Sequence, residues 1–247
     1  MKKKNPLEEF KKEVEENIRQ LGANKKLRKL ALQFMVGSLQ NKYSYNFCWL
    51  GRPIIQHPQD IAAIQELIWT VKPDLVIETG IAHGGSLILS ASILELIGGK
   101  GKVLGIDIDI RKHNRIEIEK HPMFKRINMI EGSSTDPKVL DKVKKFVKRK
   151  KRVLIFLDSS HSHSHVLREL ELYSPFVTKG SYIVVFDTIV EFMPKGSVKN
   201  RPWDKGNNPF TAVQVFLRKN KNFVVDKQIE HKLLITAAPS GFLKRVK

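Results

Sequence analysis

The fold class is decided by the stretch LVIETGIAHGGS, which spans residues 75 to 86. It begins with a short apolar run, residues 75–77, that predicts a strand, and it leads into residues 84–97, which predict a helix. The glycines between these elements let the backbone turn tightly and approach a ligand closely. Their spacing differs from the GxGxxG of a pyrophosphate-binding turn, and no GKS or GKT phosphate loop occurs in the chain.

Short apolar runs alternate with helical patterns through the middle of the chain. Further strands are predicted at residues 103–106, 153–157 and 182–186, and another strand ends at residue 130. Helices are predicted at residues 137–150 and 165–176. The run VLIFL at 153–157 is apolar throughout, as expected for a strand that is covered on both faces. Repeated strand–helix units of this kind fold into a parallel sheet with right-handed crossovers.

The carboxyl end of the chain breaks this alternation. A helix that Asn208 and Pro209 begin reaches about Arg218, and strands are predicted after it at residues 223–226 and 233–236. The connection between these strands is too short for a helical crossover, so they are expected to pair antiparallel. We therefore predict an α/β fold of the Rossmann-like class I methyltransferase plan, with a mostly parallel seven-stranded sheet and a C-terminal antiparallel hairpin.

The first fifty residues predict a helical extension, residues 1–50, ahead of one α/β domain, residues 51–247. Apolar residues recur there at helical three- and four-residue steps, at Leu7, Phe10, Val14, Ile18 and Leu21. A second helix is predicted at residues 25–39. The aromatic segment 41–53 is expected to be an ordered loop on the main body, where its rings pack or, as the less favoured alternative, line a substrate cleft.

Composition favours a globular protein of a reducing compartment. The hydrophobic fraction of 41% is enough for a buried core, and no run of about eighteen apolar residues predicts a membrane span. The N-terminus lacks the apolar stretch of a secretory signal, and a single cysteine, Cys48, excludes an internal disulfide. A cytoplasmic location is therefore expected. The sequence leaves the oligomeric state open, and a homo-oligomer is among the alternatives.

The formal net charge of +19 raises the question of an anionic partner. Local peaks of lysine occur at residues 2–4, 25–29 and 142–152. No arginine- and aromatic-rich binding motif accompanies them, so a solvated lysine-rich surface is the favoured interpretation. Peripheral contact with an anionic membrane, at its inner surface, is the second alternative, and nucleic acid is the third.

Acidic residues follow the first two predicted strands, where open α/β sheets bind ligands. The carboxylate of Glu78 would repel a pyrophosphate and attract the ammonium and sulfonium groups of S-adenosylmethionine. Asp107 ends the second strand, where an acid can accept both ribose hydroxyls of an adenosyl group, and it is favoured over Asp109. After the third strand, Ser133 either flanks the adenine or belongs to a loop that caps the helix at Pro137.

The loops after the fourth and fifth strands carry the residues that favour catalysis. Asp158 and Asp187 lie at adjacent strand ends, where two acids can share a divalent cation such as Mg²⁺ that lowers the pKa of a substrate hydroxyl. Alternatively, His161 acts as a general base. Three histidines at alternate positions, 161, 163 and 165, also suggest zinc, but Asp158 already ends the strand, so capping and positioning of the Asp158 loop is preferred to zinc.

At these motifs the chain resembles the cephalosporin hydroxylase/rhamnosyl O-methyltransferase family. The resemblance runs from about Trp49 to Val246, and its carriers are the segments 78–80, 83–86, 105–111, 113–115, 157–159, 165–167, 201–203 and 208–209, together with His161. It implies S-adenosylmethionine as methyl donor, bound by Glu78, Gly80, His83, Gly84, Ser86, Asp107 and Ser133. It also implies transfer to an oxygen of antibiotic intermediates, or of sugars in glycolipids and surface polysaccharides.

The resemblance implies a Mg²⁺ ion in some members of this family. Their metal site uses an acid after the fourth strand, which Asp158 matches, and an acidic pair after the fifth. Asp187 matches the second acid of that pair, and Phe186 stands where the first would be. A third protein ligand is therefore missing, and Thr188, Glu191 or water are the alternatives for its place.

Overall fold

The structure, a computed structural model, describes residues 5–247, so the lysine peak at residues 2–4 lies outside the described part. Its centre is a seven-stranded sheet of order β5-β4-β3-β6-β7-β9-β8. The strands are β3 Leu75–Thr79, β4 Lys102–Asp107, β5 Ile127–Glu131, β6 Val153–Leu157, β7 Tyr182–Val185, β8 Phe223–Val225 and β9 Phe242–Arg245. The first five are parallel, and β9 runs antiparallel to both β7 and β8. The predicted fold class is confirmed.

Helices cover both faces of the sheet. One face packs against α3 Pro58–Val71, α4 Gly85–Ile97 and α5 Lys112–Lys120, and the other against α6 Pro137–Val147, α7 His163–Tyr173 and α8 Pro209–Lys219. Neighbouring residues of a strand serve opposite faces: Val76 belongs to the first core and Leu75 to the second. Every residue of β3 and β6 is buried, which explains the apolar run at residues 75–77 and the wholly apolar sequence of β6.

The strand order determines where a ligand can lie. From β3 the chain first adds β4 and β5 on one side and then β6 and β7 on the other. The crossovers therefore diverge at the carboxyl ends of β3 and β6, and such a switch point is the usual ligand site of open α/β sheets.

One predicted strand is wrong. Residues 233–236 do not join the sheet; β9 is Phe242–Arg245, and the short helix α9 Lys227–Leu233 precedes the segment in question. The reason is a contact with a distant part of the chain. The buried carboxylate of Asp60 accepts hydrogen bonds from Thr236 Oγ1, at 2.5 Å, and from the N–H of Ala237, at 2.8 Å. These bonds hold the segment against α3 instead of a neighbouring strand.

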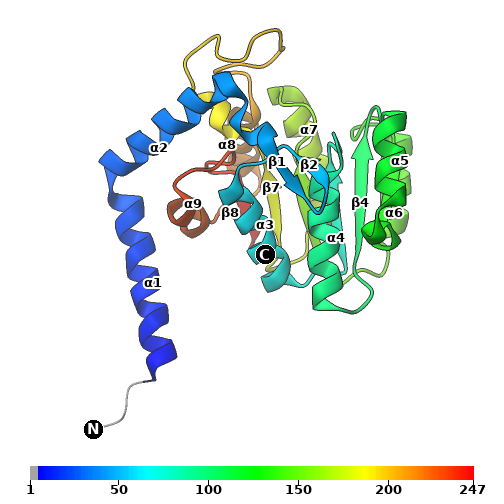
Figure 1. Cartoon of the computed structure of the whole chain (residues 1–247), viewed down its shortest axis with the longest axis horizontal. Coiled ribbons are helices and arrows are strands. Elements are labelled where there is room, and N and C mark those ends of the chain that lie inside the picture. The colour runs from blue at the N-terminus through cyan, green and yellow to red at the C-terminus, as the bar shows by residue number, and fades with distance from the viewer. Residues whose placement is uncertain (1–4) are drawn as a thin grey trace.

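The N-terminal helices α1 Pro6–Ala23 and α2 Lys25–Ser38 form an arm beside the sheet (Figure 1). The apolar stripe of α1 is largely exposed, with Leu7 at 71% and Phe10 at 63%, and α1 contacts α9. No helix within residues 5–247 is long and apolar enough to cross a membrane.

The aromatic segment after the arm is partly regular. It contains η1 Leu39–Asn41, η2 Tyr43–Asn46 and the antiparallel strands β1 Phe47–Trp49 and β2 Arg52–Ile54. The indole N–H of Trp49 donates to Ser92 Oγ on α4 at 3.0 Å, so the segment packs on the main body as predicted. The remaining short helices are η3 Pro122–Arg126, η4 Ser174–Phe176 and η5 Thr188–Phe192.

Candidate active site

The turn after β3 depends on glycine at two positions. Gly80 and Gly84 have φ angles of +89° and +84°, which L side chains rarely adopt. A Cβ atom on Gly80 would also collide with the carbonyl of Asp158, and one on Gly84 with the side chain of Ile118. The turn therefore lies directly against the loop that follows β6.

The carboxylate of Asp107 organises this turn. One oxygen accepts the main-chain N–H groups of Ile81 and Ala82, at 2.7 and 3.3 Å, and the other accepts that of Asp109 at 3.1 Å. An ionised carboxylate offers about four acceptor positions, so three are already used. Asp107 thus links β4 to the glycine turn, and its contact with a ribose stays a prediction.

Two further side chains hold the carbonyl groups of the turn. The guanidinium of Arg52, on β2, donates to the carbonyl of His83 from Nη2 at 2.7 Å and from Nε at 3.1 Å. The amide of Asn114, on α5, donates to the carbonyl of Ala82 at 3.0 Å. Asn114 Oδ1 lies 3.4 Å from His83 Nδ1, so the imidazole of His83 also rests against this clamp. Binding of the donor by His83 itself stays a prediction.

Glu78 is a buried acid beneath the turn, with 3% of its surface exposed. Ser86 Oγ donates to one carboxylate oxygen, and the other oxygen, Oε2, has no hydrogen-bond partner within residues 5–247. Burial raises the pKa of Glu78 to about 8; the Ser86 hydrogen bond opposes this shift, and Asp107 adds to it. Glu78 and Ser86 line a small cavity that also borders Gln56, Ser90 and Asp158.

The loop after β5 caps a helix. Ser133 Oγ lies 3.1 Å from Thr135 Oγ1, and the carbonyl of Ser133 accepts the N–H of Asp136 at 3.0 Å. Asp136 in turn caps α6 by accepting the N–H of Lys138. The helix-capping alternative for this loop is thus present in the structure, and the adenine contact of Ser133 stays a prediction.

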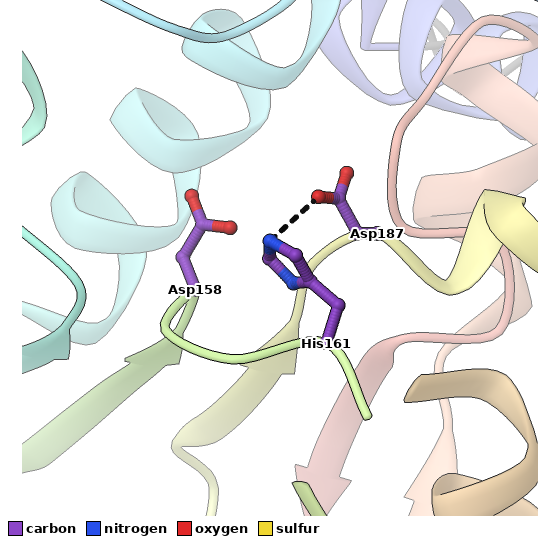
Figure 2. A group of neighbouring side chains, drawn as sticks. All are labelled: Asp158, His161 and Asp187. Atoms are coloured by element: carbon purple, nitrogen blue, oxygen red, sulfur yellow. Dashed lines mark ion pairs between the residues drawn. The ribbon is translucent and has the colours of Figure 1, made fainter. Parts of the chain in front are cut away.

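Asp158, His161 and Asp187 come together at the carboxyl ends of β6 and β7 (Figure 2). Each offers one ligand atom, and these atoms all lie within 4.8 Å of one another. The imidazole of His161 lies between the two carboxylates, and its Nε2 is 3.1 Å from Asp187 Oδ2. The predicted proximity of the two acids is therefore confirmed, and His161 is the third member of the cluster.

Acidic side chains gather around this cluster. Burial raises the pKa of Asp158 well above its ordinary value, and the carboxylates of Asp187 and Glu78 raise it further. The amide of Gln56 donates to Asp158 Oδ2 at 3.1 Å. The side chain of Asp187 is 39% exposed and that of His161 is 16% exposed, so the cluster opens to solvent on the Asp187 side.

Of the sequence alternatives for a third metal ligand, Glu191 lies outside the cluster, and Thr188 already has a structural partner. Thr188 Oγ1 donates to the carbonyl of Pro239 at 2.7 Å, and Glu191 accepts the N–H of Gly206 at 2.9 Å. Both side chains therefore have hydrogen-bond partners outside the cluster. Phe186 is buried, with its ring centroid 6.2 Å from that of Phe156, so it forms an apolar wall where an acid was expected.

The donor set fits a divalent cation through its carboxylates. Asp158 and Asp187 are close enough to share an ion, and their mutual repulsion is the strain that such an ion would relieve. Mg²⁺ prefers oxygen ligands and keeps several waters, so two carboxylates suffice for a site of the usual kind. The imidazole of His161 is a ligand that Mg²⁺ seldom takes, and in this structure its Nε2 pairs with Asp187.

The neighbouring histidines have structural partners. His163 Nδ1 lies 2.7 Å from Thr211 Oγ1 on α8, whereas His165 Nε2 lies 3.2 Å from both Ser134 Oγ and Ser159 Oγ. The three histidines therefore do not converge, which rules out the three-histidine zinc alternative. Positioning of the Asp158 loop, the structural role predicted from sequence, is what His165 does through Ser159.

Several site residues had no predicted role. Arg52 and Asn114 belong to segments singled out in the sequence, yet their clamp on the turn depends on pairing across 31 and 32 residues. Gln56 meets Asp158 across 102 residues and has no local signal. His57 is buried beside it, and burial lowers the pKa of its imidazole, against the opposing field of Asp187.

The strand order, the glycine turn at the switch point and the acids at the carboxyl ends of β3 and β4 define a class I methyltransferase. The chain belongs to the family described as Rhamnosyl O-methyltransferase/CmcI, which it matches over residues 41–246. It is therefore a methyltransferase with S-adenosylmethionine as its methyl donor, as predicted.

Two curated relatives illustrate the match. The rhamnosyl O-methyltransferase of Mycobacterium tuberculosis is 30% identical over 203 residues, which cover 80% of this chain and 75% of the relative. That of Mycobacterium leprae is 30% identical over 199 residues, covering 80% and 82%.

Solved structures share the fold at lower identity. A ligand-free structure of CmcI has a TM-score of 0.58 at 16% identity and covers 82% of this chain and 77% of that one. A CmcI structure described with Mg and S-adenosylmethionine has a TM-score of 0.57 at 18% identity, covering 82% and 78%. An O-methyltransferase from Bacillus cereus with S-adenosylhomocysteine has a TM-score of 0.52 at 15% identity, covering 81% and 82%.

Proposed function

We propose that this chain transfers the methyl group of S-adenosylmethionine to a hydroxyl of a sugar or similar polyhydroxylated acceptor. The setting we infer is the synthesis of a glycolipid, a cell-surface polysaccharide or a secondary metabolite. The observation that carries the proposal is the cluster of Asp158, His161 and Asp187 beside the glycine turn. The rhamnosyl O-methyltransferases, named for a sugar acceptor, support the acceptor class.

The chain's own residues supply a general base. When the Nε2–H of His161 donates to Asp187, its Nδ1 keeps the lone pair that can accept a proton. A carboxylate that orients an imidazole in this way selects its tautomer and stabilises the cation formed when the proton arrives. In the proposed reaction His161 therefore removes the proton of the acceptor hydroxyl.

The transfer exchanges one bond of the methyl carbon for another. The acceptor oxygen, relieved of its proton by His161, attacks the methyl carbon and forms a C–O bond. The bond between that carbon and the sulfonium sulfur breaks, its electron pair stays on sulfur, and neutral S-adenosylhomocysteine is released. The buried carboxyl of Glu78 stabilises the cationic donor before transfer when it is ionised.

A divalent ion would add to this chemistry. Asp158 and Asp187 would hold it, and it would lower the pKa of the acceptor hydroxyl. Gln56 keeps Asp158 oriented by its hydrogen bond to Oδ2. The apolar side chain of Phe186 excludes water from the inner side of the cluster.

The test uses the purified full chain with methyl-labelled S-adenosylmethionine. It is incubated with sugar and glycolipid extracts, and the labelled products are separated and identified. We expect label on a sugar oxygen, and loss of that label when His161 is replaced by Ala. A chain that binds S-adenosylhomocysteine but labels only a nitrogen, a carbon or a protein side chain would refute an oxygen-directed sugar enzyme.

A further inference from the structure

The segment 193–208, between η5 and α8, forms a strap beside the catalytic cluster. It contains the motif Arg201-Pro202-Trp203, to which the reaction itself assigns no role. The indole of Trp203 lies edge to face with the imidazole of His161, with ring centroids 4.9 Å apart. An acceptor hydroxyl that approaches His161 therefore brings its sugar ring next to the strap.

The strap is held in position by hydrogen bonds to the body of the protein. Asn207 Oδ1 accepts the N–H of His163 at 3.0 Å, and its amide donates to the carbonyl of Pro202 at 2.8 Å. Glu191 accepts the N–H of Gly206 at 2.9 Å. Because His163 begins α7 just after His161, these bonds link Trp203 to the catalytic loop and preorganise the wall that an acceptor meets.

The strap carries more positive than negative charge. The guanidinium of Arg201 lies 5.3 Å from the centroid of the Trp203 ring. Three exposed lysines accompany it, at Lys195, Lys199 and Lys205. Asp204 is the one acid of the strap, and its carboxylate accepts the main-chain N–H groups of Gly196 and Lys205 at 2.8 and 2.7 Å. These bonds keep it ionised, so the strap sets four cations against one anion.

We propose that Arg201 and Trp203 form the acceptor subsite, and that it takes a sugar carrying an anionic group, a phosphate or a carboxylate. This inference rests on the proposed function, whose substrate class it narrows. Trp203 contacts the carbon face or edge of the sugar ring. Arg201 pairs with the anionic group, since its planar fork matches the oxygens of phosphate and carboxylate bidentately.

A binding experiment tests the subsite without turnover. The full chain, loaded with S-adenosylhomocysteine, is titrated with glucose 6-phosphate, glucuronate and glucose, and binding is followed by calorimetry. We expect at least one charged probe to bind about tenfold or more tightly than glucose, and its affinity to fall as salt is raised. The preferred charged probe identifies phosphate or carboxylate as the source of the charge.

Variants assign the effect to the strap. Arg201→Gln should remove the preference for the charged probe over glucose. Trp203→Ala should weaken all three probes, and Trp203→Phe should restore most of that loss. Arg218→Gln, which removes an exposed arginine from α8, is the matched control and should bind like the unaltered chain.

Several outcomes would overturn the subsite. These are equal binding of charged and neutral probes, no binding of either charged probe at about 50 mM, or equal losses in Arg201→Gln and Arg218→Gln. The same titration without S-adenosylhomocysteine shows whether the sugars bind independently of the product, which separates this inference from the proposed function. A chain that binds charged sugars but neither donor nor product would keep the subsite and reject the methyl transfer.

Discussion

The imidazole Nε2 of His161 lies 3.1 Å from Asp187 Oδ2, although the two residues follow different strands of the sheet. Parallel strands place their carboxyl ends on one edge, so loops distant in sequence meet there. Figure 2 shows the imidazole directed at this carboxylate, with Asp158 on its other side. In the proposed mechanism, this contact lets Asp187 orient His161 as the general base.

Replacing Asp187 by Asn should lower kcat by about 10²–10⁴-fold, because the amide can no longer stabilise the imidazolium that forms during transfer. The affinity for S-adenosylhomocysteine should stay within about twofold, since Asp187 lies outside the glycine turn. Steady-state kinetics and calorimetry measure the two quantities. Asp109→Asn, which alters an acid whose side chain is 71% exposed, is the matched control. Unchanged kcat in Asp187→Asn would contradict the assignment.

Mg²⁺ should stabilise the ligand-free protein through Asp158 and Asp187, because a cation relieves the repulsion between their carboxylates. At tenfold excess over its Kd, a ligand of the folded state adds about 1.4 kcal/mol, or roughly 3–5 °C in Tm for a chain of this size. Differential scanning fluorimetry measures the shift, and Asp158→Asn should abolish it. An equal shift in Asp158→Asn, or none in the unaltered protein after treatment with a chelator, would exclude this site.

Glu78 should make the stability of the ligand-free protein fall as pH rises. Its pKa is raised from 4.5 to about 8 by burial, so the folded state binds the proton more tightly than the unfolded state. The resulting stabilisation is complete below pH 4.5 and is lost as pH rises through 8. Asp60, whose burial raises its pKa to about 7, acts in the same direction.

Glu78→Gln should therefore flatten part of the decline in Tm between pH 5 and 8.5, leaving the contributions of Asp60 and Asp158. The same variant should weaken donor binding most at high pH, where the unaltered carboxyl is ionised and attracts the cationic donor. Thermal melts and calorimetry over this pH range measure both effects. A Glu78→Gln protein with the same pH slope and the same donor affinity would contradict the role of Glu78.

Local sequence patterns predicted those elements whose burial is reflected in their own residues. Residues 75–77 of β3 and all residues of β6 are apolar because both faces of these strands are covered. Asp158 and Asp187 meet because their strands are parallel neighbours. The apolar run at 233–236 misled the prediction, because its conformation depends on hydrogen bonds to Asp60, 176 and 177 residues earlier. The residues of the run itself do not indicate that partner.

The site residues also divide into those that local sequence predicts and those whose contacts depend on packing. Acids and glycines at strand ends were found because the sheet places them at its carboxyl edge, whatever the side-chain packing. The partners of those acids were not found: the amide of Gln56 reaches Asp158 only after β2 and α3 are packed. Asp107 was expected to face a ribose, yet its carboxylate spans from β4 to the turn of β3. Contacts between loops are a property of the assembled sheet.

Arg52 holds the glycine turn in place, and its removal should weaken binding of the donor. Arg52→Ala removes two charge-assisted hydrogen bonds to the carbonyl of His83. Hydrogen bonds of charged groups are worth about 1.5–3 kcal/mol, so a turn that must be reordered on binding should lose about ten- to a hundredfold in donor affinity. The value of kcat at saturating donor should change little, because the clamp lies away from His161.

Calorimetry with S-adenosylhomocysteine and kinetics at saturating donor separate these two effects. Arg115→Ala is the matched control, because Arg115 pairs with Glu131 and Glu119 near the same turn and makes no hydrogen bond to it. Arg52→Lys should recover part of the affinity, since the ammonium keeps the charge but cannot donate from two atoms of one planar fork. A loss of kcat with unchanged donor affinity would mean that Arg52 acts on the acceptor side and that the turn is ordered without it.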